Sequence, residues 1–210
     1  MFSVEVLKQF DLNGPRYTSY PTADRFTPVF QPTDYDRALR TMRRKPVSLY
    51  VHVPFCRSLC YYCACNKIIS KSSTVADEYL ELLSQETALV AQAQADLPVV
   101  QLAFGGGTPN FLTVAQLTRL IRDLEGKFAF LPGREQGIEL DPRFLDAAYV
   151  EALPGLGFNR VSYGVQDFDE RVQTLIHRFQ SFDQTAQAVQ AARAAGINSI
   201  SFDLVYGLPI

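Results

Sequence analysis

Hydrophobic and polar positions follow two different patterns along the chain, and the change comes at Val47. Residues 1–46 show weak periodicity and many turn formers, which predicts an ordered extension with one short helix near residues 34–42. From Val47 onward, short apolar runs alternate with amphipathic stretches, which predicts strands alternating with helices. Residues 47–210 are therefore expected to form one α/β domain.

Five runs in this second part have the composition of strands. Each is rich in β-branched, aromatic or leucine side chains, and glycine, proline or polar residues follow it. The predicted strands are residues 48–53, 99–104, 138–140, 160–165 and 199–205. Alternation with helices predicts a parallel sheet with right-handed crossovers. Because an eight-stranded barrel typically needs about 250 residues, we expect a partial (β/α) barrel of about five strands.

The helices between these strands are predicted from the spacing of their apolar residues and from their caps. One begins near Thr74, and the next opens with a capping box formed by Thr113 and Gln116. The other predicted helices are one that follows Asp141-Pro142 and stops at Gly155 or Gly157, a short one over residues 171–179, and one that begins with a capping box at Ser181 and Gln184 and ends at Gly196.

The chain ends at Ile210, directly after the fifth predicted strand and without a helix to cover it. A strand with no neighbour on one side exposes unpaired backbone groups. We therefore expect these residues to be an N-terminal portion of a longer chain.

Composition and charge narrow the classes of function. A hydrophobic fraction of 47% and a charged fraction of 20% are ordinary for a globular protein. The net charge of −2 gives no electrostatic reason to expect nucleic acid or an anionic membrane as a partner. No secretion signal is recognisable, and no apolar run is long enough to cross a bilayer. A reducing, cytoplasmic setting is expected, in which clustered cysteines more often bind metal than form disulfides.

All four cysteines lie in one segment, residues 56–65. Cys56, Cys60 and Cys63 have the spacing C-x3-C-x2-C, one thiolate short of the four that usually close an iron–sulfur cluster. A cubane held by three thiolates keeps one iron open for a substrate or cofactor. The alternative is a structural zinc site, but no second cysteine or histidine pair follows downstream.

Polar or glycine-rich segments follow the predicted strands, at the end of the sheet where α/β barrels build their active sites. These segments are the cysteines, residues 105–108, 139–141 and 166–167, and Asp203. The run Gly105-Gly106-Gly107 matches neither a P-loop nor a dinucleotide fingerprint, but it would let backbone groups approach a ligand closely. Side chains alternate along a strand, so Tyr50 and His52 are expected to face the barrel interior together.

These segments in this order resemble the radical S-adenosylmethionine (SAM) superfamily, and more narrowly the oxygen-independent coproporphyrinogen III oxidases (dehydrogenases) of haem biosynthesis. Two features support the narrower resemblance: the run over residues 14–22, and Cys65, which extends the motif to C-x3-C-x2-C-x-C. The resemblance covers nearly the whole chain. Haem chaperones on the same fold, which turn over no porphyrinogen, usually lack both features and are the alternative. A non-catalytic zinc-binding module is a third possibility.

The resemblance implies a [4Fe–4S] cluster on Cys56, Cys60 and Cys63, with SAM on its open iron. It makes Cys65 a non-ligand, whereas the ordinary four-cysteine expectation would make it a ligand. The positions that it assigns to SAM are Tyr50, Tyr62, Gly106, Gly107, Thr108 and Glu139, and those for a second SAM are Gln166, Arg178 and Asp203.

Two of these assignments have plainer alternatives, and one departure from the family pattern bears on the second SAM pocket. Glu139 would otherwise be a solvated carboxylate, and Arg178 a surface charge on the predicted helix over residues 171–179. Tyr163 replaces a smaller residue that is common in the family, and it would narrow the second SAM pocket if it faced inward.

The resemblance further implies the reaction. A radical derived from SAM would remove hydrogen from two propionate side chains of coproporphyrinogen III, which would lose carbon dioxide and become the vinyl groups of protoporphyrinogen IX. The implied partners are this substrate and an unidentified electron donor, and we expect a monomer. No protein side chain is assigned to catalysis; His52 is either a support near the cluster or substrate, or a hydrogen-bonded core histidine.

Overall fold

The computed structural model describes residues 3–11, 22–41, 45–94 and 97–207, in two compact units that divide between Thr41 and Met42. The first unit contains the helices α1 (Val4–Phe10) and α2 (Pro32–Thr41) and the short 3-10 helix η1 (Ala23–Arg25). Only α2 corresponds to a predicted helix. Within the described residues, neither α1 nor α2 has a buried side chain. The run over residues 14–22 lies, apart from Thr22, outside the described residues.

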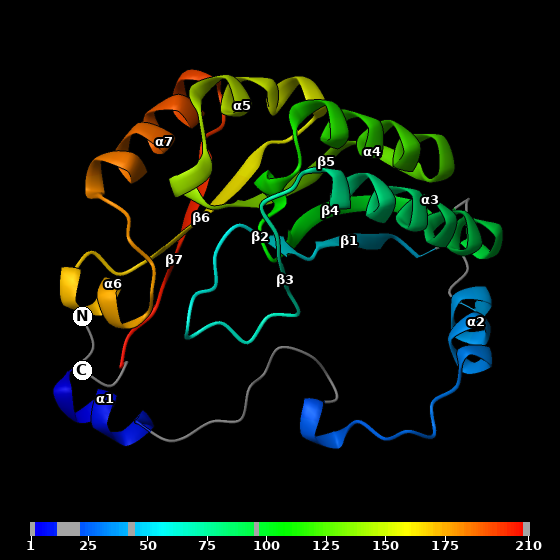
Figure 1. Cartoon of the computed structure of the whole chain (residues 1–210). Helices are drawn as coiled ribbons and strands as arrows, with labels where there is room; N and C mark the ends of the chain where they lie inside the picture. Colours follow the sequence, from blue (N-terminus) through cyan, green and yellow to red (C-terminus); the bar gives the residue numbers. More distant parts are fainter. Residues whose placement is uncertain (1–2, 12–21, 42–44, 95–96, 208–210) are drawn as a thin grey trace. The chain divides into compact units, whose positions relative to one another are not determined.

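The second unit contains a five-stranded sheet in which every neighbouring pair is parallel (Figure 1). The order β1-β4-β5-β6-β7 follows the order of the strands along the chain, as in the wall of a (β/α) barrel. This arrangement confirms the predicted parallel sheet and partial barrel. The strands are β1 (Val47–Val53), β4 (Pro98–Gly106), β5 (Ala129–Leu140), β6 (Arg160–Gln166) and β7 (Ser199–Leu204).

Four helices cover the outer side of the curved sheet (Figure 1). They are α3 (Thr74–Gln94), α4 (Val114–Lys127), α5 (Ala147–Ala152) and α7 (Phe182–Ala194). Both predicted capping boxes are present, at the starts of α4 and α7. The core lies between these helices and the sheet, where Leu102 and Phe104 of β4 and Leu117 of α4 are almost completely buried. Short 3-10 helices also occur in this unit: η2 (Pro109–Phe111) after β4, η3 (Pro142–Phe144) after β5 and η4 (Pro154–Leu156) after α5.

Three local predictions needed correction. β5 begins at Ala129 instead of residue 138, because Ala129 and Phe130 already pair with β4. An irregularity follows, in which Gly133 has a left-handed φ of 74°, and pairing resumes at Glu135. The helix predicted over residues 171–179 is α6 (Glu170–Leu175), which is shorter because His177 adopts a left-handed φ of 54°. Two short strands, β2 (Phe55–Cys56) and β3 (Ile68–Ile69), were not predicted.

Among the described residues, none of the helices combines the length and the hydropathy needed to cross a bilayer.

Candidate functional site

A cavity of about 180 Å³ lies where the carboxyl ends of β4, β5 and β6 meet the cysteine segment. Every residue predicted to bind the cluster or SAM lines this cavity, with the exception of Tyr50. The residues come from six separate stretches between Cys56 and Asp203, and the parallel sheet brings them to one place. Sequence reasoning missed Lys67 and Arg143, which also line the cavity.

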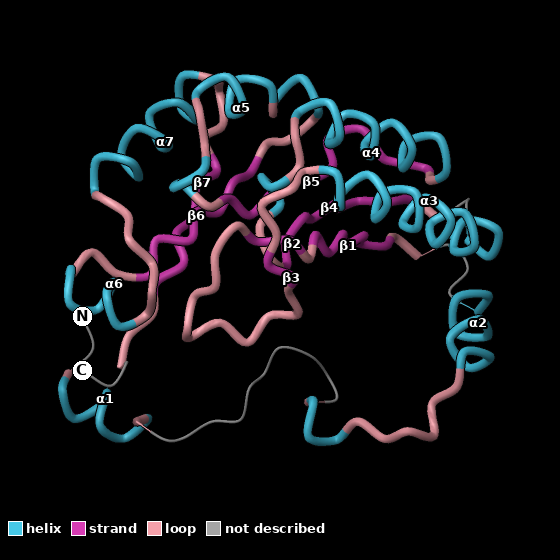
Figure 2. The backbone as a smooth tube through the Cα atoms, in the orientation of Figure 1, coloured by secondary structure: helices cyan, strands magenta, loops and turns pink. Residues whose placement is uncertain are grey.

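The cysteine segment is a loop whose two ends are joined by the pairing of β2 with β3 (Figure 2). Phe55 pairs with Ile68, and Cys56 pairs with Ile69. The Lys67 ammonium donates a hydrogen bond of 2.8 Å to the Cys63 carbonyl oxygen. The backbone therefore holds the cysteines in a closed loop before any cofactor binds.

The four cysteines are free thiols that share one wall of the cavity. Cys60 is buried, and Cys65 is exposed. Among the described residues, no group of three or more His, Cys, Asp or Glu side chains is arranged to hold a single metal ion. Thiols spread along a cavity wall fit a larger cluster. Because Cys65 lines the same wall, its role as a non-ligand stays a prediction.

The electrostatics of Cys56 also fit a metal centre. Burial raises the pKa of this thiol, and a hydrogen bond of 3.5 Å from the Thr108 hydroxyl to its sulfur acts in the opposite direction. A metal ligand must be deprotonated. The Cys56 thiolate therefore needs positive charge beside it, which cluster iron would supply.

Each glycine of the run after β4 is required by a different neighbour. A Cβ on Gly105 would lie 2.8 Å from the Glu139 carboxylate, and one on Gly106 would lie 2.7 Å from the His52 ring. Gly106 also has a φ of 110°, which disfavours other residues. A Cβ on Gly107 would lie 2.8 Å from backbone atoms of the Pro54–Phe55 turn. The run forms a bare backbone floor for the cavity, which supports the prediction that a ligand approaches it closely.

Two carboxylates face the cavity from neighbouring parts of the sheet. Glu139 is exposed as a residue, but its carboxylate lies against the glycine run and accepts a hydrogen bond from the Gly106 backbone N–H. Partial burial, together with the negative charge of Asp203, raises the pKa of Glu139. Asp203 accepts a 3.2 Å hydrogen bond from the Ser162 hydroxyl. The pair can accept hydrogen bonds from a polar or cationic ligand.

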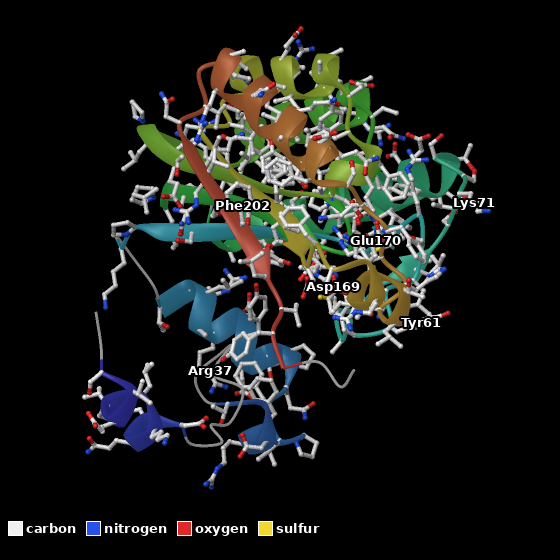
Figure 3. All side chains as sticks on the ribbon, turned by 90° about the vertical axis from the view of Figure 1, so that its left-hand side faces the viewer. Arg37, Tyr61, Lys71, Asp169, Glu170 and Phe202 are labelled. Carbon is white, nitrogen blue, oxygen red and sulfur yellow. The ribbon has the colours of Figure 1, made fainter. Side chains whose placement is uncertain are left out.

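The aromatic residues singled out in the sequence occupy different surroundings. Tyr62 lines the cavity, and burial raises the pKa of its hydroxyl. Tyr61 points outward, 67% exposed, and stacks on His177 (Figure 3). Tyr163 is fully buried beneath α7, where its hydroxyl donates to the Ala188 carbonyl oxygen at 2.9 Å. Tyr163 therefore does not narrow the cavity.

Tyr50 and His52 form a hydrogen-bonded pair beside the cavity, outside its lining. Their closest approach is 3.3 Å, between the Tyr50 hydroxyl and His52 Nδ1. His52 Nε2 lies 2.8 Å from the Asn66 carbonyl oxygen, which can only accept. The neutral ring therefore donates from Nε2 to Asn66, and its Nδ1 accepts from the Tyr50 hydroxyl. The contacts give His52 a role in fixing the cysteine segment against β1.

Arg178 is neither on a helix nor on the surface, contrary to the plainer reading of the sequence. It follows the left-handed turn after α6 and is only 6% exposed. Its guanidinium donates to the Gly164 carbonyl oxygen at 2.5 Å and to Asp141 Oδ2 at 3.3 Å. Its Nε is buried and has no hydrogen-bond partner among the described residues. A buried donor of this kind is costly unless it is satisfied.

Comparison with known proteins agrees with this geometry. The sequence profile of the radical SAM superfamily matches residues 50–210. The chain belongs to the radical SAM superfamily. Membership implies a [4Fe–4S] cluster and SAM as cofactors, as the sequence predicted.

Individual relatives are more specific. The chain is 46% identical to the oxygen-independent coproporphyrinogen III oxidase of Pseudomonas aeruginosa, over 99% of this chain and 46% of the relative. It is 42% identical to the protein of the same name from Escherichia coli, with the same coverage. The solved structure of the Escherichia coli enzyme, described as a radical SAM enzyme, superposes with a TM-score of 0.89 at 41% identity, over 100% of this chain and 46% of that one. The chain thus spans about half the length of these relatives.

Proposed function

We propose that this chain provides the cluster- and SAM-binding part of an oxygen-independent coproporphyrinogen III oxidase. The observation that carries the proposal is the convergence of three cysteines, the glycine run and Glu139 on one cavity at the carboxyl ends of the strands. Relatives with that name, 46% and 42% identical over 99% of the chain, support the substrate.

In this proposal Cys56, Cys60 and Cys63 hold the cluster and leave one iron for SAM. Bound together, the cofactors supply an electron to the SAM sulfonium and so the 5′-deoxyadenosyl radical that removes hydrogen from a propionate side chain. Gly106, Gly107 and Thr108 bring backbone and hydroxyl groups to SAM, and Glu139 accepts hydrogen bonds from it, with Tyr62 and Tyr50 as further contacts. Because Tyr50 lies outside the cavity lining, its contact requires a ligand that extends past His52.

We also propose a second SAM beside the first, held by Gln166, Arg178 and Asp203. The support is their meeting at the cavity and the unpaired Nε of Arg178, which can bind a carboxylate. Gln166 has a left-handed φ of 70°, a strained conformation that aims its amide differently from a regular strand residue. Equilibrium dialysis of the reconstituted chain should give two SAM molecules per cluster, and a ratio of one would remove this part of the proposal.

The proposal extends to the setting of the protein. The thiols must remain reduced, which fits the cytoplasm. Coproporphyrinogen III is the proposed substrate, an unidentified donor supplies the electrons, and the enzyme is a monomer. Residues 1–46 are proposed as an extension of the barrel domain at residues 47–210.

The experiment has two parts. The 210-residue chain, reconstituted anaerobically with iron and sulfide, should bind about four iron atoms and, once reduced, cleave SAM to 5′-deoxyadenosine and methionine. Zinc uptake without iron and sulfide would contradict the cofactor assignment. A chimera then carries this chain in place of the matching half of the Pseudomonas aeruginosa enzyme. It should convert coproporphyrinogen III to protoporphyrinogen IX, whereas SAM cleavage without porphyrinogen turnover would favour another substrate.

A further inference from the structure

Cys60 has surroundings that neither of the other proposed cluster ligands shares. It is 7% exposed, and two guanidinium groups approach its sulfur: Arg143 Nη2 at 3.8 Å and Arg178 Nη1 at 3.6 Å. Cys56 has one neutral donor, the Thr108 hydroxyl. Among the three proposed ligands, Cys60 is therefore the one whose sulfur has guanidinium groups beside it. The Lys67 ammonium bonds instead to the Cys63 backbone carbonyl.

Asp141 fixes the direction of both arginines. Its carboxylate accepts from Arg143 Nε at 3.0 Å and Arg143 Nη2 at 2.7 Å, which is a bidentate pair, and from Arg178 Nη1 at 3.3 Å. Asn110 holds the Asp141 backbone in turn, through bonds of 2.8 Å and 3.1 Å to its N–H and carbonyl oxygen. The Arg143 and Asp141 side chains are 10% and 6% exposed. In each guanidinium, the nitrogen that donates to Asp141 Oδ2 is also the one that approaches the Cys60 sulfur.

The charges of this group do not cancel without Cys60. Two guanidinium cations and one carboxylate leave one excess positive charge in a buried place, where an uncompensated charge is costly. A thiolate at Cys60 supplies the missing negative charge. Burial acts to lower the pKa of Arg143, but the hydrogen bond and charge of Asp141 outweigh it and raise that pKa, so the cation persists.

We propose that Arg143, oriented by Asp141, is a positioning residue that donates to the Cys60 thiolate and makes the cluster easier to reduce. The inference rests on the proposed cluster site. Reduction adds a negative charge to the cluster, and hydrogen bonds to the cluster's thiolates and nearby positive charge stabilise the reduced form. Arg143 is thus assigned a role in electron uptake, apart from any contact with SAM or substrate.

The test is an EPR-monitored redox titration of the reconstituted 210-residue chain and three variants. Arg143→Gln removes the positive charge, so the cluster in this variant should be harder to reduce. We expect the equilibrium constant for reduction to fall about tenfold, which lowers the midpoint potential by about 59 mV for one electron. Charges this close commonly shift other ionisation equilibria by about that factor or more. Asp141→Asn removes the negative charge but keeps a side-chain oxygen that can still accept from Arg143. The guanidinium therefore stays oriented, and the potential should rise. Opposite shifts are the signature, because a merely structural role would not reverse its sign.

Arg57→Gln is the matched control. Arg57 and Arg143 both lie over the Phe144 ring, with guanidinium carbons 5.7 Å and 5.1 Å from its centre, but only Arg143 contacts a cysteine sulfur. Arg57 lines the same cavity but is exposed to solvent, which screens its charge. Its variant should therefore shift the potential by much less than Arg143→Gln does. A potential for Arg143→Gln equal to that of the control, or a fall in both Arg143→Gln and Asp141→Asn, would overturn the inference.

Two further outcomes are separable. If Arg143→Gln folds but takes up no cluster, Asp141→Asn decides alone, and an unchanged or lower potential in that variant overturns the inference. If the wild-type chain takes up no cluster, the proposed function itself fails. If the wild-type chain binds a cluster whose potential does not change in Arg143→Gln, only the inference about Arg143 fails.

Discussion

Gly107 tests whether the glycine run is a floor for the cavity or an ordinary turn. Its φ is not in the left-handed region, so an alanine would be disfavoured by contact alone. The new Cβ would lie 2.8 Å from backbone atoms of Pro54 and Phe55, whereas ordinary contact begins at 3.4 Å. The overlap is 3.4 − 2.8 = 0.6 Å. Backbone atoms cannot rotate away as a flexible side chain can, so the turn before Cys56 must move.

The expected cost of Gly107→Ala is about 1–3 kcal/mol, the usual range for an overpacked buried site. For a domain of this size that lowers Tm by about 2–4 °C per kcal/mol. The same movement disturbs the Pro54 carbonyl oxygen, which accepts the Ile68 N–H at 2.7 Å at the base of the cysteine loop. Iron retention after reconstitution should therefore fall as well.

Gly126→Ala is the control, because a Cβ there would meet nothing within 4 Å. Gly126 lies in the last turn of α4, where alanine should stabilise the chain by about 0.4–1 kcal/mol. Urea unfolding followed by circular dichroism measures both free energies, and iron analysis measures the cluster. Equal stability and equal iron in the two variants would refute the argument that backbone contact at Gly107 builds the site.

Three other predictions concern the proposed ligands. Cys56→Ala, Cys60→Ala and Cys63→Ala should each lose the visible iron–sulfur absorbance, and Cys65→Ala should keep it; equal iron loss in all four would make Cys65 a ligand. Glu139→Ala should weaken SAM binding about tenfold to a hundredfold at unchanged iron content, because a hydrogen bond to a charged group contributes roughly 1.5–3 kcal/mol; calorimetry showing wild-type affinity would make Glu139 a solvated carboxylate. The pKa of Glu139 is raised in the folded chain. At pH values between its ordinary pKa and this raised pKa, the folded metal-free chain binds more protons than the unfolded chain. The free energy of unfolding should therefore fall as the pH rises through this range. Glu139→Gln should remove this fall in stability. If the free energy of unfolding changed with pH in the same way in the variant and the wild type, the prediction would be wrong.

The parallel sheet and most element positions could be predicted because their signals are local. The capping boxes at Thr113 and Ser181 marked the helix starts that the structure has. The start of β5 could not be found, because residues 129–130 pair with β4 through a long-range contact and an irregularity at Gly133 separates them from the rest of the strand.

The candidate site was partly predictable for the same reason. Its motifs lie at strand ends, and parallel pairing gathers strand ends at one edge of a sheet. Taken by itself, Arg178 would be read as a surface charge, and only the family resemblance assigned it to SAM, because burial depends on packing that helical periodicity does not encode. Arg143 carried no signal of its own beside Asp141-Pro142, since its importance comes from a sulfur 83 residues away.

The contacts of Arg178 with Cys60 also bear on the order in which the protein is made. The two residues are 118 positions apart, and a ribosome adding about 5–20 residues per second needs about 6–24 s to synthesise the intervening stretch. During that interval the cysteine segment lacks the guanidinium groups that line its wall. The nascent thiols therefore depend on the reducing capacity of their surroundings, and a metallocentre with its complete electrostatic environment forms only after translation has passed β6.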